Sequence, residues 1–196
     1  MIMGTINRFS SMFDEFYNNV YRRWRLDNEK AAKDIVGEEY EKFRKRFYTE
    51  SGFTFGDTHN VLGSGVNCDL TVMIDGKVVI VEEDKGSYVD APFLTRAIID
   101  ASRIIGTCLQ NDLEIPYYIL SCPTNMGNFD VIFNSTVELL REDIQTIIKE
   151  KFKYLPLCDT GRVNRNIYYR SENNHFVLSE EKLVEQTDFI NKILVN

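Results

Sequence analysis

Residues on which many functional sites depend are scarce in this chain. It has four cysteines without a C-x-x-C pair, and its two histidines, His59 and His175, stand in polar stretches. A zinc site or a disulfide framework requires closer clusters, so we interpret the cysteines as small buried residues in a reducing compartment. We expect both histidines to be surface residues, with a shared metal as the alternative. No G-x-S-x-G motif or phosphate-binding loop is present, which argues against the enzymes built on them.

Long apolar segments are also missing. No run approaches the roughly 20 apolar residues of a membrane-spanning helix. The N-terminal stretch MIMGTINRFSSMFDEF includes acidic residues and lacks the apolar core of a signal peptide. We therefore expect a cytoplasmic, intracellular protein without a membrane partner.

Positive charge is in the minority. The chain has 23 lysine and arginine residues against 30 aspartate and glutamate residues, a formal net charge of −7. Proteins that coat nucleic acid without sequence preference gain affinity by neutralising phosphates, and this composition argues against that class. The basic residues are nevertheless grouped, in YRRWR at 21–25, KFRKRF at 42–47 and GRVNRNIYYR at 161–170. Each group is either a solvated surface or part of a binding surface.

The order of predicted elements indicates an α/β protein. With 196 residues, the chain is long enough to bury a core as a single domain over 1–196. We expect a three-layer sandwich, in which a small mixed β-sheet is flanked by helices. Its core would span about 28–153, followed by a polar insertion at 159–175 and a C-terminal helix at 179–194. Hydrophobic spacing predicts helices over 6–48 with a break near 27–28, over 93–109 and over 129–152, a loop over 51–65, and strands over 116–122 and 176–178.

A β-hairpin is predicted from the stretch VNCDLTVMIDGKVVIVEEDKG, residues 66–86. Asp75-Gly76 is a strong turn signal between two runs of β-branched residues. Folding back at this turn brings Asp69 close to the acidic end of the second strand. The hairpin therefore gathers carboxylates that should repel each other.

The register of this hairpin decides which carboxylates meet. A two-residue turn places Asp69 opposite Glu82. A three-residue loop instead brings Glu83 and Lys85 onto the face of Asp69. A bulge further along the strand would also change the register, so the sequence leaves both pairings open.

Two neighbouring carboxylates are tolerated where a cation lies between them. Hard oxygen ligands with open positions suit magnesium, which keeps bound water and accepts phosphate oxygens. We therefore expect Mg²⁺ as the cofactor, held by Asp69 together with Glu82 or Glu83 according to the register, and no small-molecule cofactor. Lys85 can orient the attacking water and stabilise charge on a phosphate. The alternative is that VEEDKG, residues 81–86, is a strand that frays into a solvated turn, with Lys85 neutralising its neighbours.

Asp69, thirteen intervening residues and then Glu83-Asp84-Lys85 resemble the motif of the PD-(D/E)xK nuclease superfamily. This superfamily includes type II restriction endonucleases, Holliday-junction resolvases and several repair nucleases. The proline of the motif is absent, since Cys68 precedes Asp69. The family core is a mixed sheet flanked by helices, in the order helix, hairpin, helix, strand, helix, and the order expected between 27 and 152 is similar.

The resemblance implies a restriction-endonuclease-like fold and a role for each matching residue. Asp69 and Glu83 would take the metal-ligand positions, and Lys85 would be the catalytic lysine. Many members add an acidic residue from the helix before the hairpin; Glu39 is the candidate here, with Glu38 next. Arg96 would contact a backbone phosphate, or would be a solvent-facing residue of its helix.

A second basic segment is a candidate for reading bases. Between 159 and 171 the sequence DTGRVNRNIYYRS is rich in arginine, which suits guanine edges, and asparagine, which suits adenine. We predict a base-reading loop braced by the C-terminal helix, with a surface β-hairpin that binds nothing as the alternative. The candidate DNA-binding residues are Arg162, Asn164, Arg165, Asn166 and Arg170.

These features together predict a magnesium-dependent endonuclease of double-stranded DNA, and in particular a small sequence-specific type II restriction endonuclease. Cutting both strands of a palindrome calls for two active sites, so we expect a homodimer. One alternative is a structure-selective or repair nuclease of the same superfamily, such as a junction resolvase. The other is a non-catalytic interaction module, in which the hairpin acids are solvated and the helices bind a protein.

Overall fold

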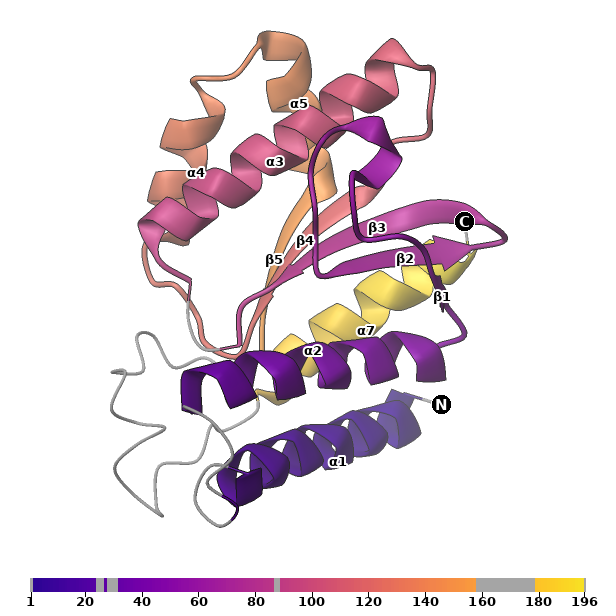
Figure 1. The fold of residues 1–196 in the computed structure, drawn as a ribbon, viewed down its shortest axis with the longest axis vertical. Helices are drawn as coiled ribbons and strands as arrows, with labels where there is room; N and C mark the ends of the chain where they lie inside the picture. Colours follow the sequence, from indigo (N-terminus) through magenta and orange to yellow (C-terminus); the bar gives the residue numbers. More distant parts are fainter. Residues whose placement is uncertain (1, 24–26, 28–31, 87–88, 158–178, 196) are drawn as a thin grey trace.

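A five-stranded mixed β-sheet lies at the centre of the chain (Figure 1). The computed structural model describes residues 2–23, 27, 32–86, 89–157 and 179–195. Strands β1, β2 and β3 pair antiparallel, whereas β3, β4 and β5 pair in parallel, in the order β1-β2-β3-β4-β5. The strands are β1 (Thr54–Phe55), β2 (Leu70–Ile74), β3 (Lys77–Asp84), β4 (Tyr117–Cys122) and β5 (Phe152–Pro156).

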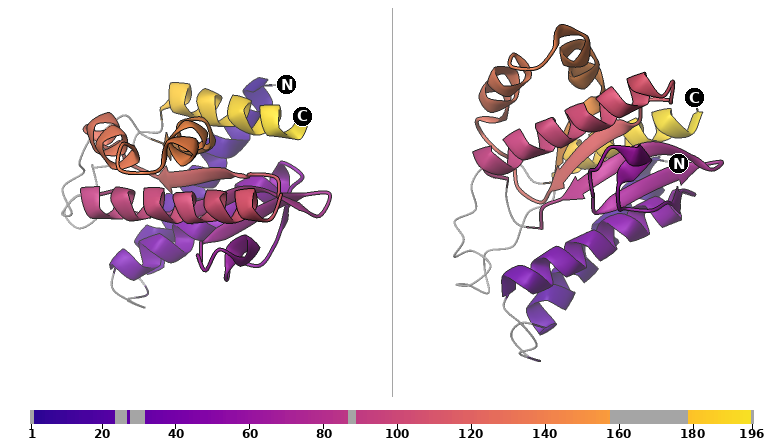
Figure 2. Two further views of the ribbon diagram at one scale, coloured as in Figure 1. Left: turned by 90° about the horizontal axis from the view of Figure 1, so that it is seen from above. Right: turned by 45° about the horizontal axis from the view of Figure 1, so that its top comes forward.

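Helices cover both faces of this sheet (Figures 1 and 2). Helices α3, α4 and α5 pack on one face, and α2 and α7 pack on the other, where α1 packs against them in turn. The predicted class, α/β with a small mixed sheet flanked by helices, is therefore confirmed. The helices are α1 (Ile2–Tyr21), α2 (Ala32–Glu50), α3 (Ala91–Gln110), α4 (Phe129–Val137), α5 (Glu142–Lys151) and α7 (Glu180–Val195), with a 3₁₀ turn η2 (Val61–Gly63).

Helix α3 begins where its sequence predicts. The side chain of Asp90 accepts a hydrogen bond of 3.0 Å from the backbone N–H of Phe93, and Pro92 stands in the first turn. The apolar face of the helix is buried from Leu94 to Cys108. This start places the first turns of α3 next to the end of β3, where the acidic residues lie.

One predicted helix is wrong, because the apolar pattern over 129–152 belongs to three elements. Helix α4 ends at Val137, the chain becomes extended at Arg141 (φ −63°, ψ 145°), and α5 follows. The side chain of Gln145 donates to the carbonyl of Leu140 at 2.8 Å, which satisfies one of the groups exposed by the break. Leu139 in the break is 86% exposed; it stands outside the helical apolar spacing, which continues instead at Leu140.

Two strands, β1 and β5, were not predicted. β1 consists of two residues within the predicted loop over 51–65, too short to show an alternating pattern. β5 begins at Phe152, where the predicted helix was expected to end. The predicted strand over 176–178 lies outside the described residues.

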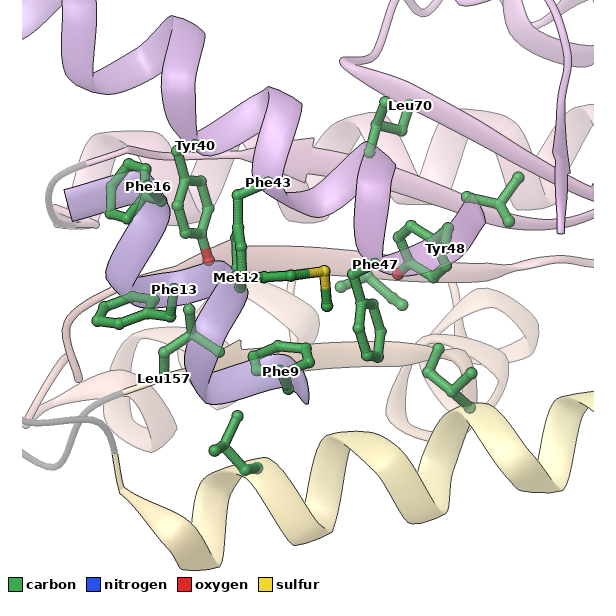
Figure 3. Close-up of a cluster of buried hydrophobic side chains, with 14 of the residues drawn as sticks. Phe9, Met12, Phe13, Phe16, Tyr40, Phe43, Phe47, Tyr48, Leu70 and Leu157 are labelled. Carbon is green, nitrogen blue, oxygen red and sulfur yellow. The ribbon is translucent and has the colours of Figure 1, made fainter. Parts of the chain in front are cut away.

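An aromatic core holds α1 against α2 (Figure 3). Phe9 makes edge-to-face contacts with Phe43 and Phe47, with ring centroids 5.1 and 4.5 Å apart. Phe16 contacts Tyr40 in the same way at 5.6 Å. The apolar face predicted for α2 is thus buried, and it fixes that helix across the sheet beneath β3.

Candidate active site at the end of strand β3

The hairpin between β2 and β3 turns at Asp75 and Gly76. Both residues have left-handed backbone angles (φ 48° and 78°), and Ile74 pairs with Lys77 across the turn. Positive φ at both central positions is typical of a two-residue type I′ turn, for which Asp-Gly is a preferred sequence. The shorter of the two predicted loops is therefore the one that forms.

A β-bulge follows the turn. Met73 pairs with Val78, but the next residue of β2, Val72, pairs with Ile80. Val79 is the extra residue, and both Val79 and Ile80 pack toward the same core. The bulge thus shifts the register of the hairpin by one residue.

This shift brings Asp69 beside Glu83. Beyond the bulge Leu70 pairs with Glu82, and the backbone N–H of Asp69 donates to the carbonyl of Glu82 at 3.1 Å. The two-residue turn alone would have paired Asp69 with Glu82. The bulge gives instead the arrangement expected from the longer loop.

Asp69 is held by the backbone of the neighbouring strand. Its Oδ2 accepts a hydrogen bond of 2.7 Å from the backbone N–H of Asp84. Burial raises the pKa of Asp69, and this hydrogen bond opposes the rise. The nearby charges of Glu41 and Glu82 raise the pKa further.

Glu83 lies in a more strongly perturbed environment. Its side chain is 15% exposed, and its Oε1 accepts a hydrogen bond of 2.8 Å from Nη2 of Arg96 on α3. Burial, together with the charge of Asp69, raises the pKa of Glu83 to about 7, although Arg96 opposes the rise. The ionised form of Asp69 therefore disfavours ionisation of Glu83 in this partly buried site.

Lys85 lies on the same face of β3 as Glu83. Its Nζ is 4.4 Å from the ring centroid of Phe93, and the guanidinium of Arg96 lies 4.6 Å from the same centroid. Phe93 thus links the lysine and the arginine. Glu83 and Lys85 both contact the first turns of α3, as alternation along a strand requires.

Asp100 is a member of this cluster that the sequence analysis missed. Burial raises its pKa while Arg96 and Arg103 oppose the rise, and its own charge raises the pKa of Glu83. The signal was helical spacing, since Phe93, Arg96 and Asp100 stand at i, i+3 and i+7 of α3.

The opposite face of β3 carries a different acidic pair. Glu82 is fully buried, and its carboxylate accepts hydrogen bonds of 2.6 and 3.0 Å from Nε and Nη2 of Arg44, with a further one from the hydroxyl of Tyr48. Nη1 of Arg44 donates to Gln186 of α7 at 2.8 Å. Glu82, the alternative metal ligand, therefore forms a buried ion pair with Arg44.

Asp84 shares that buried face. Both of its carboxyl oxygens are buried and have no hydrogen-bond partner among the described residues. Burial and the charge of Glu82 raise its pKa well above the usual value, although Arg44 opposes the rise. These surroundings favour the neutral form of the Asp84 side chain, and its backbone N–H is the group that bonds Asp69.

The carboxylate of Glu39 is bound by two cations. It accepts hydrogen bonds of 2.6 Å from Arg23 and 2.7 Å from Lys42. Burial raises the pKa of Glu39, but these two cations outweigh it and the pKa lies below the usual value. The carboxylate of α2 whose charge acts on Asp69 is Glu41.

The structure describes some of the remaining predicted residues and not others. The candidate base-reading residues Arg162, Asn164, Arg165, Asn166 and Arg170 lie outside the described residues, as do His175 and Cys158. His59 is exposed in the loop before β2, next to Asp57. Cys108 and Cys122 are buried and Cys68 is half-buried, close to the expectation for small buried residues.

Magnesium fits the donor set of Asp69 and Glu83. In the parts of the chain that the structure describes, no group of three or more His, Cys, Asp and Glu side chains is arranged to hold a metal ion. Magnesium, however, is often bound by one or two carboxylates together with water and substrate phosphates. The raised pKa values of both residues, and the guanidinium already bound to Glu83, show that this pair favours a cation.

Comparison of the chain with protein-family models, with curated proteins and with solved structures gave no significant match. Within the described ranges, no helix combines the length and apolar composition that crossing a membrane requires. A functional assignment therefore depends on the chemistry of the site itself.

Proposed function

We propose that this protein is a magnesium-dependent nuclease of the PD-(D/E)xK type, which hydrolyses phosphodiester bonds in double-stranded DNA. The observation that carries the proposal is the gathering of Asp69, Glu83 and Lys85 at one end of β3, against α3. The order α2, β2–β3 hairpin, α3, β4 is similar to the core of that superfamily, and it supports a restriction-endonuclease-like fold.

Asp69 and Glu83 would hold the metal. Bound Mg²⁺ would activate a water molecule and neutralise charge that develops on the phosphate. The hydrogen bond from the backbone N–H of Asp84 fixes the orientation of the Asp69 carboxylate before any ligand arrives. Lys85 presents its ammonium on the same face, where it can orient the water or stabilise a phosphate oxygen.

Arg96 has a role that the motif does not include. Its guanidinium neutralises Glu83 in the protein alone, and it can equally donate two hydrogen bonds to a phosphate. Its side chain is 59% exposed, so it can move from the carboxylate to DNA. When magnesium binds Glu83, Arg96 would therefore release this carboxylate and bind a phosphate of the substrate instead.

Sequence-specific cleavage as a homodimer remains the preferred form of the proposal. An acidic protein can still bind DNA in a locally basic groove, and specificity requires only base contacts inside that groove. Cleavage of a palindrome by two symmetric sites would follow from a C2 dimer. A nuclease that selects branched structures uses the same chemistry, so the substrate distinguishes the two.

The test is incubation of the purified protein with long duplex DNA and, separately, with a four-way junction, each with magnesium and with EDTA. The informative variants are Glu83→Gln and Lys85→Met, which change charge and keep side-chain size. Their matched controls are Glu114→Gln and Lys149→Met, exposed residues of the same types away from the site. Size and dimer formation are checked by light scattering.

Magnesium-dependent cleavage that is lost in both site variants and kept in both controls would support the proposal. Discrete fragments of duplex DNA would indicate a restriction endonuclease, and cleavage of the junction alone would indicate a resolvase. Absence of cleavage from both substrates, or cleavage unchanged in Glu83→Gln, would overturn the proposal. The first of those outcomes would favour a non-catalytic interaction module.

A further inference from the structure

A separate groove lies at the other end of the sheet from the acidic cluster. It has a volume of about 840 Å³ and is lined by the hairpin turn, the starts of β3 and β4, the junction of α5 with β5, and the last turns of α7. Lys77 on its rim stands six residues before Glu83 along β3, which corresponds to roughly 20 Å of extended strand. The groove is therefore distinct from the proposed nuclease site, and the inference below does not depend on that function.

The groove concentrates positive charge in an acidic protein. Two acidic residues, Asp75 and Glu114, also line it, and Glu114 lies 3.6 Å from Lys77. Both partners of that pair are more than 70% exposed, so the pair is weak and can open for a ligand. The lysines that line the groove are Lys77, Lys151, Lys153 and Lys192.

One wall of the groove is aromatic. Tyr117, the first residue of β4, packs edge-to-face against Phe189 of α7, with ring centroids 5.1 Å apart. The ammonium of Lys151 lies 4.4 Å from the centroid of Tyr117, and that of Lys153 lies 6.0 Å from it. The lysines are therefore held beside the rings instead of extending into solvent.

We propose that this groove binds a phosphorylated small molecule of nucleotide size. Its phosphate would lie on Lys151 and Lys153, and its flat body would pack against Tyr117 and Phe189. The volume lies within the roughly 300–1,000 Å³ of small-molecule sites. An inorganic anion alone would leave the aromatic wall uncovered, and an uncharged ring would not use the positive charge of Lys151 and Lys153; the Nζ of Lys151 lies 3.8 Å from a carboxylate oxygen of the exposed Glu150.

The test is isothermal titration of the full chain with AMP, adenosine and inorganic phosphate as three separate probes, without magnesium. We expect AMP to bind saturably and the other two at least ~10-fold more weakly, since each makes only part of the contacts. Lys151→Gln/Lys153→Gln should weaken AMP binding by ~10-fold or more, and Phe189→Leu should weaken it while leaving phosphate unaffected.

The matched control is Lys149→Gln, which removes the same charge from the last turn of α5 but lines a different groove. Equal losses in Lys149→Gln and in the double variant would mean general electrostatic attraction and would overturn the proposal. So would the absence of saturable AMP binding, or binding of duplex DNA to this groove with no competition from AMP. Urea unfolding of each variant shows whether a loss of binding reflects a loss of folding.

Discussion

Nη2 of Arg96 lies 2.8 Å from Oε1 of Glu83, so that helix α3 supplies a cation to a carboxylate whose pKa is raised by the charge of Asp69, the residue before β2. The guanidinium only partly offsets the burial of Glu83 and the charge of Asp69, since the pKa of Glu83 still rises to about 7. Without a ligand, the site thus has too little positive charge to balance its carboxylates, and Glu83 titrates in the physiological pH range. The first predictions follow from that shortage.

The first prediction concerns stability and pH. The pKa of Glu83 rises from 4.5 to about 7 on folding, so between these values the folded protein holds a proton that the unfolded chain has released. The contribution of Glu83 to the free energy of unfolding is present in full below pH 4.5 and is lost as the pH rises through 7. The loss has a ceiling of about 3 kcal/mol.

Glu83→Gln should therefore lose less stability than the wild type when the pH rises from 5 to 8. Urea unfolding followed by circular dichroism at several pH values measures both slopes. Asp69 and Asp84 contribute in the same direction in both proteins, so the difference between the slopes reports Glu83 together with its coupling to Asp69. Identical slopes would show that Glu83 titrates normally.

The second prediction is that magnesium raises the melting temperature more at pH 8 than at pH 6. A metal binds the ionised carboxylate, so its affinity increases as the pH passes the pKa of Glu83. Differential scanning fluorimetry with magnesium titrations measures the shift. Glu83→Gln should remove it, and Glu114→Gln should keep it; a shift that survives in Glu83→Gln would place the metal elsewhere.

The third prediction concerns Arg96. Arg96→Met removes the cation that favours ionised Glu83, so the pKa of Glu83 should rise and the pH at which magnesium begins to bind should rise with it. The control is Arg103→Met, an arginine of the same helix that pairs with Asp100 at 3.7 Å. Magnesium titrations across the pH range compare them, and equal midpoints in the two variants would exclude a specific effect of Arg96.

The fourth prediction tests the buried pair on the other face of β3. Arg44→Met leaves the carboxylate of Glu82 without its cation in the core, and this should lower the free energy of unfolding by about 3–5 kcal/mol. The double variant Arg44→Met/Glu82→Gln should recover part of that loss, since no charge stays buried. Urea unfolding of the two variants measures this coupling, and a loss below about 1 kcal/mol for Arg44→Met would contradict it.

The fifth prediction concerns the contact of α2 with the end of β3. A Cβ on Gly86 would lie 2.8 Å from the carbonyl oxygen of Val36 and 2.9 Å from Cα of Gly37, both backbone atoms. Gly86→Ala should therefore displace the chain beside Lys85 and reduce both stability and DNA cleavage. Gly106→Ala in α3 meets nothing within 4 Å and should stabilise the protein by about 0.5–1 kcal/mol. Unfolding curves for both variants measure the contrast, and a neutral Gly86→Ala would mean that α2 can move away.

Local signals predicted much of this fold. Asp75-Gly76 indicated the turn, and hydrophobic spacing indicated α3 and the helical region over 6–48 that contains most of α1 and most of α2. Each of these signals depends on residues within one or two turns of one another. The break between α4 and α5 gave no such signal, because the apolar helical spacing continues across it from Val137 to Leu140 and Ile144.

The sequence predicted which residues form the candidate site, but not the bulge that aligns them or the partners that they bind. The motif placed Asp69, Glu83 and Lys85 together, yet the bulge at Val79 lies within a run of four similar residues, VVIV, none of which marks it. The ion pairs of Glu39 involve Arg23, just after α1, and Lys42 of α2, which no motif encodes. Arg44 did carry a signal, since it stands four residues from both Tyr40 and Tyr48 on the buried face, where an arginine requires a buried acid.

The bulge also changes what an alteration in strand length would do to the protein. Val79 is the residue without a partner, so its deletion would leave a continuous ladder from the turn to the acidic end, with Asp69 still across from Glu83. A second inserted residue, in contrast, would have to lengthen the turn, or it would shift the pairing beyond it by one residue. Such a shift would move Glu83 to the face of the sheet opposite Asp69. The pairing of the hairpin therefore allows the loss of one residue at this point without separating Asp69 from Glu83.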